Sequence, residues 1–394
     1  MIRCGAFCLT LEEGAGEKAS RAAGGIDRHG VEVRSHAGID LLDGRRGNLV
    51  ALEFGERGGL PVVHGSLGDE ACLGEFSMME ETERSIVASR DWFGTRPLFR
   101  ALSGEWVASD HRFFPGEQRE LIPPGARLEV ASGEVLTASW AQEHELVPTF
   151  DEAAQKLAAM TDASVRSRVE GKRRVAVAFS GGLDSSILAC CASKHTKTVA
   201  CCVSARGSTD SRVAEEAARA IGLEFATAEM SREDVSKELG ALDLPFQPSP
   251  MDRGLWCLYS MTAQLASESG AELILLGQLA DELFGGYAKY EAALRTGGGA
   301  EASKMMSEDV MGCGERGFIR DELACSRWCE PRFPFAEGRL ARFGQLLPVK
   351  YKLRNGARKA VLREAALRLG LPEEIAYRPK KAAQYSSGVL KLLG

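Results

Sequence analysis

Hydrophobic and polar residues alternate in two different ways along this chain of 394 residues. Before residues 145–155, short β-rich runs alternate with glycine-rich turns, as in GNLVALEFGERGG, RSIVASRDWFG, EWVASD and ARLEVASGEVLTA. This pattern predicts an antiparallel sheet. Beyond that point, strand-like and helix-like patterns follow one another, which predicts a parallel sheet with right-handed helical crossovers. We therefore expect two domains, over residues 1–147 and 150–394.

The second domain contains four apolar runs that we interpret as strands, at residues 174–179, 198–204, 224–230 and 272–277. An amphipathic helix is expected before them over 151–170, and further helices between them within DSRVAEEAARAIG and around 255–269. From about Tyr287 the pattern is helical and ends in RKAVLREAALRLG. The short TGGGAEAS stretch is expected to be a mobile loop.

The composition argues against a nucleic-acid-binding protein and against a membrane-spanning one. A hydrophobic content of 44%, a charged content of 26% and a net charge of −6 are ordinary for a soluble globular protein. Because there is no basic tail, extended nucleic-acid binding is not supported. No apolar run approaches the roughly 20 residues that a membrane span needs. We expect a cytoplasmic protein that acts on small molecules, and a homodimer is left open.

Eleven cysteines are present, and Cys190, Cys191, Cys201 and Cys202 lie inside apolar runs. A reduced thiol in such a run behaves as a small hydrophobic group. No C-x2-C pair occurs, which favours buried thiols over a zinc or iron–sulfur site. An odd count also fits a reducing compartment better than a disulfide framework.

The stretch VAVAFSGGLDSSILACC (175–191) is strand-like, then glycine-rich, then helix-like. Glycines allow a sharp turn close to a ligand, and the N–H groups of a following helix form an anion site. Asp184 fits beside phosphates once a divalent cation lies between them, so a pyrophosphate group with magnesium is expected. The alternative is a helix N-cap with tight-turn glycines. The string resembles the PP-loop of N-type ATP pyrophosphatases, which cleave ATP to AMP and pyrophosphate.

A second acidic loop, LILLGQLADELFGGYAKY, follows the fourth expected strand. Its carboxylates would stand at the carboxyl end of a parallel strand, where such sheets bind ligands. A solvated acidic helix start is the alternative. The loop resembles the SGxGxDExFGGY segment of asparagine synthetases. RDELACSRWCEPRFPFAEGRL (320–340) and LPEEIAYRPKKAAQYSSGVLK (371–391) are similar to that family's "RD…E-x-R-x-PFLD" and terminal lysine elements, so the resemblance covers roughly residues 150–394.

This resemblance implies a site for ATP and Mg²⁺. Asp184 and Asp281 would hold the metal, Lys380 and Glu330 would be catalytic, and Lys381 would be a neighbour in a basic segment. A solvated basic end is the alternative for both lysines. The residues implied to bind ATP or its pyrophosphate, with Val203 contacting adenine through its backbone, are Ser180, Gly181, Gly182, Asp184, Ser185, Ser186, Val203 and Gly277.

Two residues depart from the asparagine synthetase pattern. Gln278 stands where that family carries a glutamate that can take a proton from ammonia, and an amide cannot act as that base. Glu337 replaces the aspartate of PFLD, a milder change. These departures leave the nucleophile open and, to a smaller extent, the acceptor acid.

The N-terminal domain resembles the glutamine amidotransferase half of the same enzymes. The segment 75–100 is similar to their "ARDxxGxxPLYY" element and implies a shortened αββα sandwich. Cys4 resembles the N-terminal nucleophile, but Met1, Ile2 and Arg3 precede it, and such a nucleophile needs its own free amine. The Asn-Gly-Glu element of the glutamine site is absent. A glutaminase that requires trimming to Cys4 and an inactive domain both stay open.

The function favoured by the sequence is ATP-dependent amide synthesis through an acyl-adenylate, with aspartate as the acid and ammonia or glutamine as the nitrogen donor. A different amide or lactam is one alternative. A tRNA-modifying PP-loop enzyme, such as a thiolase or a lysidine-type synthetase, is another. A non-catalytic relative that binds a nucleotide or a partner is the third.

Overall fold

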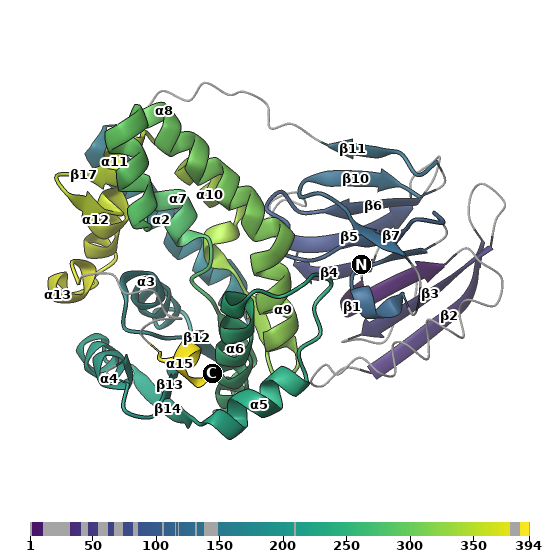
Figure 1. The fold of residues 1–394 in the computed structure, drawn as a ribbon, viewed down its shortest axis with the longest axis horizontal. Coiled ribbons are helices and arrows are strands. Elements are labelled where there is room, and N and C mark those ends of the chain that lie inside the picture. Colours follow the sequence, from purple (N-terminus) through teal and green to yellow (C-terminus); the bar gives the residue numbers. More distant parts are fainter. Residues whose placement is uncertain are drawn as a thin grey trace. The chain divides into compact units, whose positions relative to one another are not determined.

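The computed structural model describes residues 2–10, 32–40, 46–53, 62–66, 74–81, 86–104, 106–114, 116, 118–130, 132–137, 149–208, 210–378 and 387–393 (Figure 1). The chain forms two compact units. The first comprises Met1–Glu143 together with Cys313–Ile319, and the second comprises His144–Gly312 and Arg320–Gly394. A short downstream segment therefore belongs to the first unit.

The described part of the first unit is a sheet, as its alternating pattern predicted. The strand order is β11-β10-β6-β5-β4-β1-β8-β7-β9, with β3 pairing with β1 and β2. All pairs are antiparallel except β1 with β4. The helical layers of an αββα sandwich are not tested by these residues. The strands are β1 Ile2–Thr10, β2 Glu32–Asp40, β3 Arg46–Glu53, β4 Val62–Ser66, β5 Glu75–Glu81, β6 Ile86–Arg90, β7 Phe99–Ala101, β8 Trp106–Ala108, β9 Arg119–Leu121, β10 Ala126–Glu129 and β11 Val135–Thr137.

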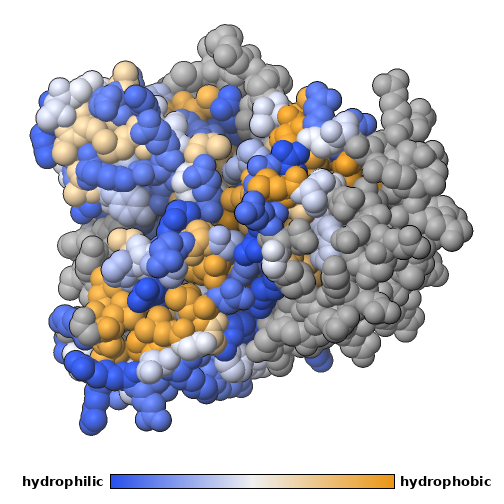
Figure 2. All heavy atoms as spheres, turned by 45° about the vertical axis from the view of Figure 1, so that its right-hand side comes forward, coloured by the Kyte–Doolittle hydropathy of each residue, from blue (hydrophilic) through white to orange (hydrophobic). Residues whose placement is uncertain are grey.

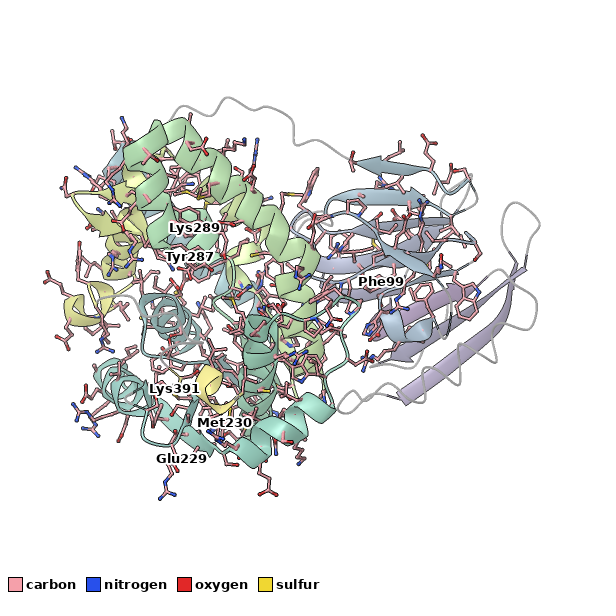
Figure 3. The ribbon with its side chains drawn as sticks, viewed as in Figure 1. Phe99, Glu229, Met230, Tyr287, Lys289 and Lys391 are labelled. Atoms are coloured by element: carbon pink, nitrogen blue, oxygen red, sulfur yellow. The ribbon has the colours of Figure 1, made fainter. Side chains whose placement is uncertain are left out.

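The core of this unit is built from alternate strand residues. Met79, Ile86, Leu98 and Val107 are buried together with other apolar residues of the sheet. Phe99, labelled in Figure 3, packs edge-on against His111 of a 3-10 turn and against Phe114. Burial of these side chains is the main source of this unit's stability, since apolar burial contributes roughly 25 cal/mol per Å².

Asp91 organises the turn after β6. Its buried carboxylate accepts hydrogen bonds from the backbone N–H groups of Phe93 and Thr95 and from the Thr95 hydroxyl, at 3.0, 2.9 and 2.7 Å. Burial raises the pKa of Asp91, and these donors oppose that shift. A buried carboxylate is tolerated only when it is hydrogen-bonded in this way.

Arg90 joins the same turn to the downstream segment. Its guanidinium donates to the carbonyls of Ile122, Gly94 and Gly314, at 2.8, 2.8 and 2.6 Å. Gly94 has a φ of +65°, and a Cβ there would lie 2.9 Å from this guanidinium. The residues that carry the amidotransferase resemblance therefore form a structural unit, which includes Gly314 of the segment Cys313–Ile319.

The second unit contains a five-stranded parallel sheet in the order β14-β13-β12-β15-β16. The four expected strands are confirmed, and the fifth, Glu330–Arg332, was not recognised because its three residues include two charged ones. Helices cross between the strands (Figure 1). The elements are α2 Phe150–Val169, β12 Arg174–Ala178, α3 Leu183–Ala192, β13 Lys197–Ala205, α4 Asp210–Ile221, β14 Glu224–Met230, α5 Arg232–Gly240, α6 Pro250–Glu268, β15 Leu273–Leu275, α7 Ala280–Phe284 and β16 Glu330–Arg332.

Local sequence sets the beginnings of three helices. Thr149, Ser231 and Ser249 are the N-caps of α2, α5 and α6, and each forms a capping box with the acidic residue three positions later. β13 is buried along almost its whole length, as expected for a strand covered on both faces. Because these features are local, the sequence alone could predict these helices and strands.

The remaining elements are mainly helical. A short hairpin, β17–β18, interrupts them and leads directly into α12. The elements are α8 Ala288–Gly312, a π-helix Cys313–Gly317, α9 Phe318–Ser326, α10 Gly338–Leu346, α11 Val349–Lys352, β17 Leu353–Arg354, β18 Ala357–Arg358, α12 Ala360–Arg368, α13 Glu373–Ala376 and α15 Val389–Leu392.

The prediction of a mobile loop at TGGGAEAS is wrong. These residues lie within α8, which is broken at Gly298, where φ is 78° and ψ is −172°. Lys289 contacts Asp309 at 2.6 Å across this break, and the Tyr290 hydroxyl donates to the same carboxylate at 2.5 Å. The Lys289 ammonium lies 5.6 Å from the centre of the Tyr287 ring, and both residues are labelled in Figure 3. Glycine supplies the break, and the ion pair joins the two helical parts.

Within the described residues, no helix is both long enough and apolar enough to cross a membrane. In Figure 2, the coloured part of the visible face is mostly hydrophilic, with hydrophobic residues gathered at the lower left and around the upper centre. The eight cysteines whose side chains are described are buried thiols, as their apolar surroundings predicted.

Candidate functional site

The glycine-rich loop between β12 and α3 has a geometry that only glycine allows. Gly181 has a φ of +68°, and a Cβ there would lie 2.8 Å from the Val213 carbonyl oxygen. Gly182 is the N-cap of α3 and forms no side-chain capping bond. The first N–H groups of α3 are thus left for another acceptor, which makes this helix start suited to an anion.

The three serines of the loop differ in what they do. The Ser180 and Ser185 hydroxyls lie 3.3 Å apart, and Ser180 Oγ also accepts from the Gly182 N–H at 3.3 Å. These contacts shape the loop. Ser186 is fully buried, and its hydroxyl has no hydrogen-bond partner among the residues that the structure describes. Of the three serines, Ser180 and Ser185 are therefore the two whose hydroxyls bond within the loop.

The second loop packs directly against the first. It leaves β15, passes through Gly277 and Gln278, and reaches Leu279, whose φ of 76° is left-handed. A Cβ at Gly277 would lie 3.1 Å from the Asp184 Cβ. Helix α7 then begins and carries Asp281. The two expected carboxylates are thus brought to the same edge of the sheet.

Lys359 lies between these two carboxylates. Its Nζ is 2.6 Å from both Asp184 carboxylate oxygens and 2.6 Å from Asp281 Oδ1. The lysine side chain is only 3% exposed, whereas Asp184 and Asp281 are about one-fifth exposed, at 22% and 20%. Burial by itself lowers the pKa of Lys359, but Asp184 and Asp281 outweigh it and hold that pKa above its usual value. The ammonium is charged and compensates both acids.

The close approach of these groups also explains the glycine pair after α7. A Cβ at Gly286 would lie 1.8 Å from Asp281 Oδ1 and 2.5 Å from Lys359 Cε. No side chain fits there. The absence of a side chain at Gly286 therefore leaves space for the ion cluster.

Sequence reasoning missed Lys359. The residue directly precedes α12 and has a left-handed φ of 58°. A cation at a helix N-terminus opposes the helix dipole, and a non-glycine residue rarely adopts this backbone conformation. Of these two conflicts, the sequence shows only the lysine at the start of an expected helix, because the φ angle belongs to the structure and the partners of Lys359 lie far away in the chain.

The carboxylates of Asp184 and Asp281 could hold a divalent cation. They converge on one ammonium, so this point already binds a positive charge, and carboxylate oxygens are the ligands that Mg²⁺ prefers. Among the described residues, no group of three or more His, Cys, Asp or Glu could hold a metal. Any metal here would need further ligands, such as phosphate oxygens, to complete its coordination.

Glu282, next to Asp281, is almost completely buried. The Tyr287 hydroxyl donates to its Oε1 at 2.7 Å. Burial and the neighbouring Asp281 raise the pKa of Glu282 to about 6. The alternative of a solvated acidic helix start does not apply to Glu282, because this residue is buried.

The structure does not bring Glu330 to this edge. Glu330 is the first residue of β16 and is paired in register with Leu273, four residues before Gly277. At about 3.3 Å per residue, this places it roughly 13 Å back along the sheet. Its carboxylate contacts Arg332 at 2.5 Å. The structure therefore does not place Glu330 beside Asp184 and Asp281, and its catalytic role stays a prediction.

Two other residues of the segment 320–340, Arg320 and Glu337, form structural contacts. Arg320 contacts Asp252 of α6 at 3.0 Å and Asp321 at 2.7 Å, and so braces α9. Glu337 accepts a hydrogen bond from the Leu340 N–H at 2.8 Å and caps α10. Glu337, which stands where the family pattern has aspartate, therefore acts here as a helix cap.

The remaining expected residues fall in three places. Val203 is buried near the carboxyl end of β13, and the Ala205 N–H donates to the Ser387 carbonyl at 2.7 Å. Lys380 and Lys381 lie outside the described residues. Cys4 is in β1, in register with Glu53 and His64, and its side chain is also outside the description.

Comparison with known proteins identifies the family. The family model described as asparagine synthase matches residues 156–315 and 315–392. The chain belongs to the asparagine synthase family. This confirms the family expected from the loops, and with it the enzyme class, an ATP-dependent amide ligase.

Individual relatives of this asparagine synthase family chain are similar over most of its length. A putative glutamine-hydrolysing asparagine synthetase of Methanocaldococcus jannaschii is 28% identical over 81% of this chain and 69% of its own. The mouse glutamine-hydrolysing enzyme is 25% identical over 80% of this chain and 63% of its own, so this chain spans about two-thirds of the length of these relatives.

Two solved structures are more distant. NMN synthetase from Francisella tularensis is 13% identical, with a TM-score of 0.33 over 60% of this chain and 77% of its own. The ammonia-dependent NAD synthetase from Campylobacter jejuni is also 13% identical, with a TM-score of 0.30 over 60% and 81%. Scores this low carry no structural argument.

Replacing Lys359 by Met should destabilise the protein by about 3–5 kcal/mol, because two partly buried carboxylates lose their counter-charge. Urea denaturation at neutral pH measures this change. The exposed Lys350→Met is the control and should change stability by less than about 0.5 kcal/mol. Equal stability of the two variants would mean that Lys359 does not compensate the carboxylates.

Lys352, at the base of the hairpin that leads to Lys359, should make stability depend on pH. Its Nζ donates weakly to the Gln345 carbonyl at 3.4 Å, and burial lowers its pKa to about 7. Between this value and the usual 10.5, the unfolded chain binds more protons than the folded one. Stability should therefore rise with pH over this window, by up to about 1.4 kcal/mol per unit.

Lys352→Met should remove this slope, whereas Lys350→Met should keep it. Urea denaturation at pH 7, 8 and 9 gives the comparison. Parallel curves for wild type and Lys352→Met would contradict the assignment.

Proposed function

We propose that this protein synthesises an amide from a carboxylic acid and ammonia, with cleavage of ATP to AMP and pyrophosphate. The observation that supports this most is the convergence of Asp184, Asp281 and Lys359 beside a glycine loop and the start of α3. Two carboxylates and an ammonium at an anion-binding helix start suit a polyphosphate with a divalent cation. Membership of the asparagine synthase family agrees with this proposal.

In the proposed reaction, an oxygen of the acid attacks the α-phosphorus of ATP, and the bond to the bridging oxygen breaks to release pyrophosphate. Ammonia then attacks the acyl carbon of the adenylate. AMP leaves with the bonding electrons, and one proton passes to solvent. Because the protein forms no covalent bond, its contribution is positioning and compensation of charge.

Asp184 and Asp281 would hold magnesium, which supplies positive charge to the pyrophosphate when it is bound. Lys359 would then exchange its carboxylate partners for phosphate oxygens. The free N–H groups of α3 and the Ser180 and Ser185 hydroxyls would bind the same anion. A lysine suits this exchange, because its ammonium is compact and its three donors rotate freely.

Arg378 and Ser387, the described residues that flank Lys380 in the chain, support a role for this lysine. Arg378 Nη1 donates to the Gly181 carbonyl at 2.9 Å, and the Ser387 carbonyl accepts from the Ala205 N–H at 2.7 Å. Lys380 follows Arg378 by two residues, a span of at most about 7 Å. We therefore assign Lys380 to the phosphates and the developing charge at the acyl carbon, and the Val203 backbone to adenine.

Aspartate is the acid favoured by the family. Gln278 stands in the second loop, between Gly277 and the left-handed Leu279, and cannot act as a base. A different amide or a lactam therefore stays the second candidate. The buried thiols fit a reducing compartment such as the cytoplasm.

A pyrophosphate-release assay with ATP, Mg²⁺, ammonium and a panel of acids tests this function. Asp184→Asn and Asp281→Asn should each lower turnover by more than roughly 100-fold, because the pyrophosphate charge is no longer compensated. The exposed Asp151→Asn is the control. Release that requires tRNA instead of an acid, or near-normal release from either site variant, would refute the proposal.

The nitrogen source is a separate prediction. We expect free ammonium to support amide formation and glutamine to support it poorly, because three residues precede Cys4. Cys4→Ala should leave ammonium-dependent turnover within about twofold of wild type, as the two half-reactions belong to different units. A purified chain that begins at Cys4 and releases glutamate, with loss of that release in Cys4→Ala, would show a working glutaminase.

A further inference from the structure

One buried arginine links the two basic groups that reach the glycine loop. Arg363 lies on α12, one turn after Lys359, and is almost completely buried. Its Nε donates to the Arg358 carbonyl at 2.8 Å. Its Nη1 donates to the carbonyls of Ala376 and Arg378, the latter at 3.3 Å.

The partners of this guanidinium lead directly to the site. Arg358 immediately precedes Lys359, whose ammonium binds Asp184 and Asp281. Arg378 donates from its own Nη1 to the carbonyls of Gly181 and Val213, at 2.9 and 3.3 Å. Arg363 therefore fixes the backbone from which one cationic side chain reaches Asp184 and another reaches Gly181.

Only an arginine can make this set of contacts. The planar guanidinium presents five donors in a fixed fork, and here three carbonyls from two separate segments accept from it. A lysine ammonium has three donors at one point and cannot span the same carbonyls. Its carbonyl partners are neutral, so the contact is directional and does not neutralise charge.

Lys359 also needs such support. Its left-handed φ of 58° is unfavourable for a residue with a side chain, by roughly 1–2 kcal/mol. Such a conformation persists only when surrounding contacts determine it. The Arg363 bond to the preceding carbonyl is one of these contacts.

We propose that Arg363 is a positioning residue that holds Lys359 in place for the phosphate site. This inference rests on the proposed function, since it assigns Arg363 to the same site. It differs from a role in folding alone, because it predicts that the effect of Arg363 passes through Lys359.

The test is a double-mutant cycle with Arg363→Gln and Lys359→Met. Pyrophosphate release gives kcat and KM, and calorimetry gives binding of magnesium pyrophosphate. Arg363→Gln should lower kcat/KM roughly 10–100-fold, the range seen for residues that orient the ligands of a site. In the Lys359→Met background, the same change should cost less than about threefold, because the residue it positions is absent.

Two further variants sharpen the test. Arg363→Lys keeps the charge and most of the alkyl packing, and should be as impaired as Arg363→Gln. Arg368→Gln is the control on the same helix, where Arg368 is partly exposed and pairs with Asp151 and Glu364. It should stay within about twofold of wild type.

The outcomes separate this inference from the proposed function. A wild-type protein that neither binds magnesium pyrophosphate nor releases it would remove the proposed function. An active wild type in which the losses multiply independently, or in which Arg363→Lys restores activity, would overturn the role of Arg363. If Arg363→Gln does not fold, Arg363→Lys carries the same cycle, and failure of both to fold would assign Arg363 to stability and also overturn the proposal.

Discussion

The ammonium of Lys359 and the carboxylates of Asp184 and Asp281 form the contact on which the second unit's site depends. Lys359 follows Asp184 by 175 positions, and the two acids lie in the first turns of α3 and α7, at the carboxyl edge of the sheet. The cluster carries two negative charges and one positive charge. It is therefore stable without a ligand and still attracts a further cation, which suits a site that binds a metal together with a polyphosphate.

Backbone constraints around this cluster follow from its compactness. A Cβ at Gly286 would clash with Asp281 and Lys359, and a Cβ at Gly277 would make a tight contact of 3.1 Å with the Asp184 Cβ. Gly181 is fixed in the same way against the backbone of α4. Each glycine thus allows one pair of segments to approach, and together they bring the loop after β12, the loop after β15 and the start of α12 to one point.

The first unit uses buried polar groups differently. Asp91 and Arg90 bind backbone groups of one turn, and Arg90 also binds the Gly314 carbonyl. These contacts hold a loop and a downstream segment in place, and no acidic side chain accepts from Arg90 in them. Neighbouring arginine and aspartate residues here have a structural role. In the second unit the two aspartates are partly exposed, and they stand with the buried Lys359 at an anion-binding helix.

The sequence by itself determined the elements and the two loops. Alternation of apolar and polar residues predicted both sheets, and the strand–loop–helix string around Gly181 predicted an anion site, because these signals depend only on neighbouring residues. Asp184 and Asp281 could be placed together because parallel strands end at the same edge.

Only the tertiary structure decided which distant groups meet. Lys359 and Arg363 entered the site because a hairpin returns them to it, and no local pattern encodes that return. Glu330 left the site because the register of β16 places it beside Leu273, although its sequence element resembles a catalytic one. Gly298 breaks α8, and an ion pair between Lys289 and Asp309 joins the two helical parts, so this segment is not a loop. Register and long-range ion pairs depend on contacts between residues far apart in the chain, so the fold alone determines them.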